Sequence, residues 1–169
     1  MAECPLEAVQ QDSRSVGAVE DAEIILRAAY DPLHFKKGKL QSSIVRATDL
    51  FDGTLSVWRV SEKAEFTLAD GVAACGERGP VGQTLREVRG LVVKEVRDAR
   101  RPEMTGRIFC VIDETDTDMC GGSHPAHAHI RICATIMKHV GSRDDPTFLI
   151  AKSHLGFLLR RPVAKLYPI

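Results

Sequence analysis

The chain of 169 residues has few aromatic residues, no excess of either charge and no long apolar run. Aromatic side chains make up 5% of the sequence, which argues against a surface for stacking nucleic-acid bases. Lys plus Arg equals Asp plus Glu at 23 each, so the zero net charge gives no general attraction to nucleic acid or anionic membranes. No apolar stretch approaches the length that spans a bilayer. We therefore expect neither a membrane nor a nucleic-acid partner.

The five cysteines follow no recognisable spacing, and the sequence contains no CxxC pair. The first residues lack a basic segment followed by an apolar run, so we expect no secretory signal. Together these features predict a cytoplasmic protein with reduced, unpaired thiols.

Length and composition, with 44% hydrophobic and 27% charged residues, predict one domain with an ordinary core. Residues 1–18 are polar and unpatterned, so we expect a loose tail before a single globular domain at 19–169. The predicted fold class is α+β, with about four helices packed on a small, mostly antiparallel sheet. The expected helices are 19–30, 61–75, 124–140 and 146–160, and the expected strands are 54–60, 91–96 and 107–112.

Two of these helices illustrate the patterns used. At 146–160, Asp145 is a suitable N-cap and Pro146 suits the first helical position. At 19–30, the apolar residues Ile24, Ile25, Ala28 and Ala29 form a stripe between charged residues. That spacing predicts an amphipathic helix.

The strand at 54–60 places a charged residue among apolar ones. Its alternation puts Arg59 on the same face as Leu55 and Val57. Such an arginine has a carboxylate partner, contacts an anionic ligand, or reaches solvent from the strand end. Further along, 91–96 and 107–112 flank a loop and are expected to pair, and a short helix is expected from Gly79 through Arg89.

A cluster of titratable side chains follows the acidic loop at 113–118. Three of the six histidines, His124, His127 and His129, lie within ten residues of one another, together with Cys120. Groups of this kind occur at active and metal sites, and also at ordinary helix starts. The spacing matches no standard zinc motif, so we expect no metal and no cofactor.

Whether this segment is helix or strand decides what the histidines can do. At about 100° per residue, polar and apolar residues of 124–140 separate onto two arcs, and Pro125 and Gly141 suit the two ends of a helix. A helix with a buried His129 is therefore the preferred prediction. In a helix His127 and His129 point roughly 160° apart. A strand is the alternative, and only a strand places both on one face where they can bind one metal ion.

Two short segments resemble known proteins. The sequences Leu-Ser-Val-Trp-Arg at 55–59 and Pro-Ala-His-Ala-His-Ile at 125–130 resemble an uncharacterised group of short bacterial cytosolic proteins over about residues 25–135. In that group an acidic residue stands at the position of His129. The resemblance implies a bacterial cytosolic protein, points to Arg59 and His127, and supplies no reaction. The His-x-His pair also resembles that of histidine-triad nucleotide hydrolases, but Arg131 stands where their third histidine is needed.

Two functional hypotheses follow. The first is a non-catalytic interaction subunit of a larger bacterial system with a protein partner, which the absence of a complete catalytic motif favours. The second is an enzyme that handles a small molecule or nucleotide. In that enzyme Arg59 and His124 bind the ligand, and His127 and His129 are the catalytic candidates, with His127 as acid/base near a helix N-terminus. A cleft that contains Arg59, His124 and His127 would favour the enzyme, and an exposed apolar patch would favour the subunit.

Overall fold

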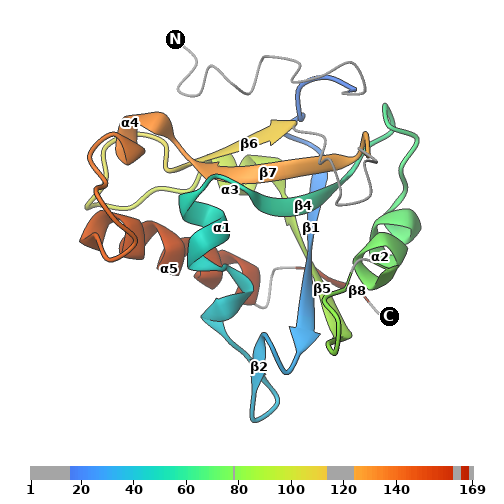
Figure 1. Cartoon of the computed structure of the whole chain (residues 1–169). Coiled ribbons are helices and arrows are strands. Elements are labelled where there is room, and N and C mark those ends of the chain that lie inside the picture. Colours follow the sequence, from blue (N-terminus) through green and yellow to red (C-terminus); the bar gives the residue numbers. More distant parts are fainter. Residues whose placement is uncertain (1–15, 78, 114–123, 162–164, 168–169) are drawn as a thin grey trace.

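The computed structural model describes residues 16–77, 79–113, 124–161 and 165–167 (Figure 1). Its strands and helices alternate irregularly along the chain. The strands are β1 Ile24–Asp31, β2 Phe35–Lys36, β3 Lys39–Leu40, β4 Leu55–Val60, β5 Thr84–Val92, β6 Phe109–Asp113, β7 His127–Ile132 and β8 Lys165–Tyr167. The helices are α1 Ala47–Phe51, α2 Leu68–Glu77, α3 Val93–Arg97, α4 Ala134–Met137 and α5 Pro146–Arg160, with a 3-10 turn at Ser42–Ile44.

A six-stranded sheet in the order β6-β7-β4-β1-β5-β8 forms the centre of the molecule, and every neighbouring pair in it is antiparallel. The β2-β3 hairpin forms a separate small sheet. The long helix α5 packs against one face of the main sheet, and α2 packs against the other (Figure 1). The predicted α+β class with helices on an antiparallel sheet is therefore confirmed. No helix in the described ranges combines the length and apolarity that crossing a membrane requires.

Three predicted elements are confirmed because local signals specify them. Helix α5 starts where expected, with the Asp145 carboxylate accepting a hydrogen bond from the Thr147 N–H at 2.8 Å and Pro146 in the first turn. Strand β4 matches the predicted 54–60 within a residue, and β6 overlaps 107–112. Pro162, which follows the predicted end of this helix, lies outside the described residues.

The predicted helix at 19–30 is wrong, because β1 occupies 24–31. This strand lies between β4 and β5, and core residues cover both of its faces. Ile25 and Leu26 are consecutive and both buried, on opposite faces. A register shift between Ala29 and Tyr30 further breaks the alternation. The buried pairs Ile25–Leu26 and Ala29–Tyr30 are therefore four residues apart, which is also the spacing of an apolar stripe on a helix.

The predicted helix at 124–140 is also wrong, because its first half is strand β7 and its second half contains the four-residue helix α4. Strand β7 pairs with β4 on one side and β6 on the other, so backbone pairing overrides the apolar arc of the wheel. The prediction that His129 is buried is confirmed, at 6% exposed.

Other boundaries differ in the middle of the chain. Helix α2 starts at Leu68 instead of 61, after a mutual cap in which the Thr67 N–H and hydroxyl bond the Asp70 carboxylate. Residues expected as a short helix at 79–89 and a strand at 91–96 form β5 and then α3. The expected pairing of 91–96 with 107–112 is wrong, because β7, β4 and β1 lie between β5 and β6.

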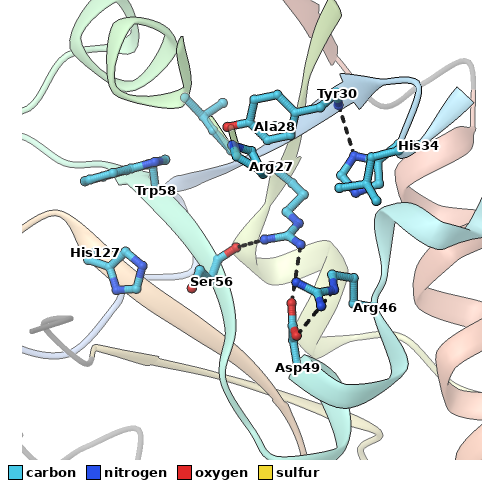
Figure 2. A pocket seen from close by; sticks show the side chains of 12 residues that line it. Arg27, Ala28, Tyr30, His34, Arg46, Asp49, Ser56, Trp58 and His127 are labelled. Carbon is cyan, nitrogen blue, oxygen red and sulfur yellow. Dashed lines mark hydrogen bonds and ion pairs between the residues drawn. The ribbon is translucent and has the colours of Figure 1, made fainter. Parts of the chain in front are cut away.

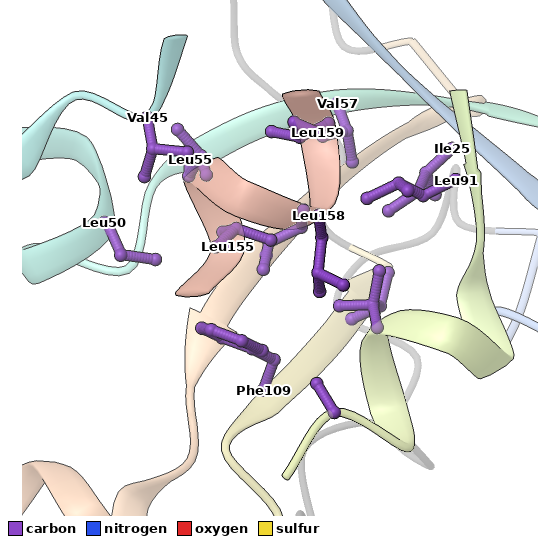
Figure 3. Close-up of a cluster of buried hydrophobic side chains, with 14 of the residues drawn as sticks. Ile25, Val45, Leu50, Leu55, Val57, Leu91, Phe109, Leu155, Leu158 and Leu159 are labelled. Carbon is purple, nitrogen blue, oxygen red and sulfur yellow. The ribbon is translucent and has the colours of Figure 1, made fainter. Parts of the chain in front are cut away.

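The larger core lies between the sheet and α5 (Figure 3). Leu155, Leu158 and Leu159 of α5 meet Leu55 and Val57 of β4 together with side chains from neighbouring strands. A smaller core under α2 contains Leu26, Trp58, Phe66 and Cys75. Burial raises the pKa of the Cys75 thiol to about 12, so Cys75 is an uncharged packing residue at neutral pH.

Arg59 is a buried cation that joins three parts of the chain. Its guanidinium makes two hydrogen bonds to Glu23, at 2.7 and 2.8 Å, and an ion pair with Asp113 at 2.9 Å. It also donates to the carbonyl oxygens of Gly17 and Ala18. Burial opposes the charge, but the bonds to Glu23 and the charges of both carboxylates outweigh burial and raise the pKa of Arg59. The end of β4 is thereby held to the end of β6 and to the segment before β1.

We predict that Arg59→Met lowers the free energy of unfolding by about 3–5 kcal/mol, because it leaves two carboxylates in a site built around a cation. Urea denaturation at pH 7 measures this loss. Arg143→Met, at an exposed position, is the matched control and should change stability by less than about 0.5 kcal/mol. A loss of under about 1 kcal/mol for Arg59→Met would show that the ion pairs do not stabilise the fold.

Candidate functional site

The two central strands of the main sheet separate after a short stretch of pairing. β1 pairs with β4 only at Ile24–Val60, Ile25–Arg59 and Leu26–Trp58. Beyond that point β1 continues along β5, and β4 continues along β7. We call this separation the fork, and define it by residues 27–31 of β1 and 55–57 of β4. Backbone groups that face the fork need partners other than a neighbouring strand.

Arg27 supplies such partners inside the fork. Its Nη1 donates to the Ser56 carbonyl at 2.7 Å, and its Nε donates to the Ile44 carbonyl at 3.3 Å. Its Nη2 lies 3.9 Å from Asp49 of α1, and only 14% of the side chain is exposed. Desolvation is the main cause that lowers the pKa of Arg27, but an arginine in a protein keeps its proton. The fork is thus occupied by a fixed positive charge.

His34 lies in the turn after β1 and is 2% exposed. Its Nδ1 accepts a hydrogen bond from the Tyr30 backbone N–H at 3.0 Å, and the backbone N–H of His34 donates to the Tyr30 carbonyl at 2.7 Å. Burial, then the charges of Arg27 and Arg46, lower the pKa of His34 to about 4. The ring is therefore neutral at pH 7, with its proton on Nε2 because Nδ1 is an acceptor. That buried Nε2 has no hydrogen-bond partner among the described residues.

A cavity of about 250 Å³ extends from the fork (Figure 2). Its walls come from β1, the following turn, α1, β4 and β7. The lining residues are Leu26, Arg27, Ala28, Tyr30, Leu33, His34, Arg46, Asp49, Ser56, Trp58, Pro80 and His127. Arg27, His34, Arg46 and Asp49 gather at one end, whereas Trp58 and His127 lie at the other (Figure 2).

The charged end of the cavity has an excess of positive charge. Arg27 and Arg46 carry two positive charges, and Asp49 carries one negative charge. Asp49 is shared, because Arg46 Nε lies 3.7 Å from one of its oxygens and Arg27 Nη2 lies 3.9 Å from the other. His34 is neutral and adds no charge, so this end of the cavity is basic. Its chemistry suits an anion or a strongly polarised carbonyl group.

The three histidines gather around Trp58 on the α2 side of the sheet. His127 and His129 lie on one face of β7 with ring centroids 4.9 Å apart. Trp58 meets His127 at 5.5 Å and His124 at 5.1 Å, both edge to face. His124 also accepts a hydrogen bond from the Ala126 N–H at its Nδ1, which shapes the turn into β7. His127 is the member of this trio that lines the cavity.

Arg59 and His127 are not brought into one cleft, although their strands are neighbours. Trp58 is the cross-strand partner of His127, so the side chains of His127 and Trp58 share a face and Arg59 points to the opposite one. Arg59 has no exposed surface and is held by Glu23 and Asp113. Of the alternatives for Arg59, the structure therefore shows the carboxylate partner. Roles for His124, His127 and His129 in binding or catalysis stay predictions.

The strand geometry of β7 reopens the question of a metal ion, since His127 and His129 now share a face. In the described ranges, no three or more His, Cys, Asp or Glu side chains are arranged to hold a metal ion. Cys120 and residues 114–118 of the acidic loop lie outside those ranges, and Asp113 pairs with Arg59. The expectation that no metal is bound therefore stays a prediction.

Sequence patterns did not indicate the residues at the charged end of the cavity. Arg27 lies inside the segment 19–30 that was predicted as a helix, and His34 was not singled out. Asp49 lies in the short helix α1, which no pattern predicted, and Arg46 directly precedes it. The one available signal was Arg27 itself, a cation inside the apolar run Ile24–Tyr30. Once that run is assigned to a strand, Arg27 indicates a buried partner or ligand, as Arg59 does in β4.

No protein-family model, no curated protein and no solved structure matches this chain. Fold and cavity thus define it only as an α+β protein with a small basic cavity at a fork in its sheet. The resemblance to short bacterial proteins stays a prediction.

We predict a specific acid sensitivity from His34. Its pKa is about 6.5 in the unfolded chain and about 4 in the folded one, so the folded state binds fewer protons between these values. The contribution of His34 to the free energy of unfolding is fully present above pH 6.5. It is lost as the pH falls toward 4, by about 1.4 kcal/mol per pH unit. Urea denaturation from pH 7.5 to 4 measures this slope.

His34→Asn is the comparison variant, because its amide oxygen can accept from the Tyr30 N–H and the side chain does not titrate. We expect the stability difference between the wild type and His34→Asn to shrink as the pH falls through this window. A difference that stays constant with pH would contradict the assignment of a buried neutral histidine.

Proposed function

We propose that this protein binds a small anionic molecule in the cavity at the fork. The observations that carry the proposal are the excess of positive charge from Arg27 and Arg46 in the cavity wall, and His34 in the same wall, whose buried Nε2 donor has no described partner. A buried donor without an acceptor costs about 1–3 kcal/mol, and an anionic oxygen would remove that cost. The positive charges make an anion a better acceptor than a neutral carbonyl group.

This proposal keeps the small-molecule hypothesis from the sequence and changes its residues. Arg27 and Arg46 take the anion-binding role that was expected for Arg59. His127 lines the other end of the same cavity, so it is the group that would exchange a proton with a bound ligand if the protein is an enzyme.

The interaction subunit of a bacterial system is the second candidate, and one observation favours it. Leu149 and Phe157 of α5 are 47% and 53% exposed, eight residues apart on its outer side. Two side chains make a small patch compared with typical interfaces. Loss of a copurifying protein in Leu149→Glu/Phe157→Glu, without a change in thermal melting, would support this candidate, and an unchanged complex would contradict it.

We predict that acetate or inorganic phosphate, added at constant ionic strength, raises the melting temperature of the wild type. Arg46→Gln should weaken binding about tenfold, because a charged hydrogen-bond donor at the cavity is lost. Arg46 is suited to this test because 58% of its side chain is exposed, so its replacement disturbs little packing. Isothermal titration calorimetry measures the affinities.

Arg143→Gln is the matched control, since it removes the same charge from an exposed position that does not line the cavity. It should leave anion affinity unchanged. Equal losses in both variants would mean that only the overall charge matters, and no binding by any anion to the wild type would refute the proposed function.

A further inference from the structure

We infer that the ligand is an aromatic carboxylate, with its acid group at the charged end of the cavity and its ring against the apolar wall near Trp58. This inference rests on the proposed function and specifies the class of ligand.

The size of the cavity limits the ligand. Its volume of about 250 Å³ lies just below the usual range of about 300–1,000 Å³ for cavities that take drug-sized molecules. That size favours a ligand smaller than a nucleotide. A single ring with a short acidic substituent is of the right size.

The charge of the cavity limits the acid group. Arg27 and Arg46 exceed Asp49 by one positive charge. A monoanion balances that excess. A phosphate dianion would leave one uncompensated negative charge close to the Asp49 carboxylate. The two oxygens of a carboxylate can also accept from an arginine and from His34 Nε2 at once.

The remaining wall is suited to a flat apolar body. Ala28, Leu33 and Pro80 supply aliphatic surface, and Trp58 supplies an aromatic ring. Trp58 is fixed in place by Phe66, with ring centroids 5.6 Å apart, and by His127. A preformed wall of this kind gains affinity from an aromatic ring without first ordering its own side chains.

The test uses benzoate, cyclohexanecarboxylate, acetate and inorganic phosphate as probes on the full chain. Trp58 is the only tryptophan of the sequence and lines the cavity, so its fluorescence reports directly on occupancy. Calorimetry gives the affinities independently. We expect benzoate to bind at least tenfold more tightly than each of the other three, and to change the Trp58 emission.

Two exposed apolar residues provide matched variants. Leu33 is 42% exposed and lines the cavity, whereas Val81 is fully exposed and does not. Leu33→Ala should weaken benzoate binding several-fold and leave acetate binding unchanged. Val81→Ala should leave both unchanged. Neither substitution touches the core, so folding should be preserved.

The outcomes separate this inference from the proposed function. If acetate binds as tightly as benzoate, or phosphate binds more tightly, the anion site stands and the aromatic ligand is refuted. If cyclohexanecarboxylate equals benzoate, the ligand needs only an apolar body and the inference is also overturned. If no probe binds, the proposed function fails as well.

Discussion

Arg27 lies where the two central strands of the sheet stop exchanging backbone hydrogen bonds. Where the sheet separates, strand carbonyl groups lose a neighbouring strand as donor, and Arg27 bonds the Ser56 carbonyl of β4 at this point. Arg27 also bonds the Ile44 carbonyl, in the 3-10 turn before α1. The strands can therefore diverge without leaving these groups unpaired. The cavity exists because of this divergence, and its positive charge comes from the same side chain. In this molecule the stability of the fork and the chemistry of the candidate site depend on one residue.

Two arginines near the centre of the sheet, Arg59 fully buried and Arg27 14% exposed, thus have different consequences. Arg59 is enclosed between Glu23 and Asp113, so its charge is more than neutralised within the core. Arg27 has only a distant carboxylate, Asp49, which it shares with Arg46. The first is a structural ion cluster that holds strand ends together, and the second leaves an excess of positive charge beside a space. Both side chains are largely enclosed, and the geometry of their carboxylate partners separates a structural arginine from a candidate ligand-binding one.

The same contrast explains which predictions from sequence were right. Both ends of helix α5 were predicted correctly. Its start is specified by Asp145 and Pro146, which act only on the residues that follow them directly in the chain. Strand β1 was predicted as a helix because both of its faces are buried, so its apolar residues come in pairs instead of alternating. Strand β7 does alternate, but the longer segment 124–140 also fits a helical wheel, and only the pairing with β4 and β6 decides for the strand. The burial of His129 was predicted correctly from the wrong element, since apolar neighbours indicate burial in either conformation. The link between Arg59 and a carboxylate was foreseen as an alternative, but its partners, Glu23 and Asp113, were not.

The sequence by itself determined the α+β class, the strand around Arg59, the last helix and the need to compensate a cation in an apolar strand. These features depend on local periodicity, caps and the solvation of charge, which act over a few neighbouring residues. Tertiary structure alone decided the order of the strands, the fork and the cavity. The cavity gathers side chains from Leu26 to His127 that no local pattern connects, because strand pairing between distant segments sets which faces meet. For that reason His127 could be singled out from the sequence, whereas Arg27, His34 and Arg46 could be recognised only once the strands were in place.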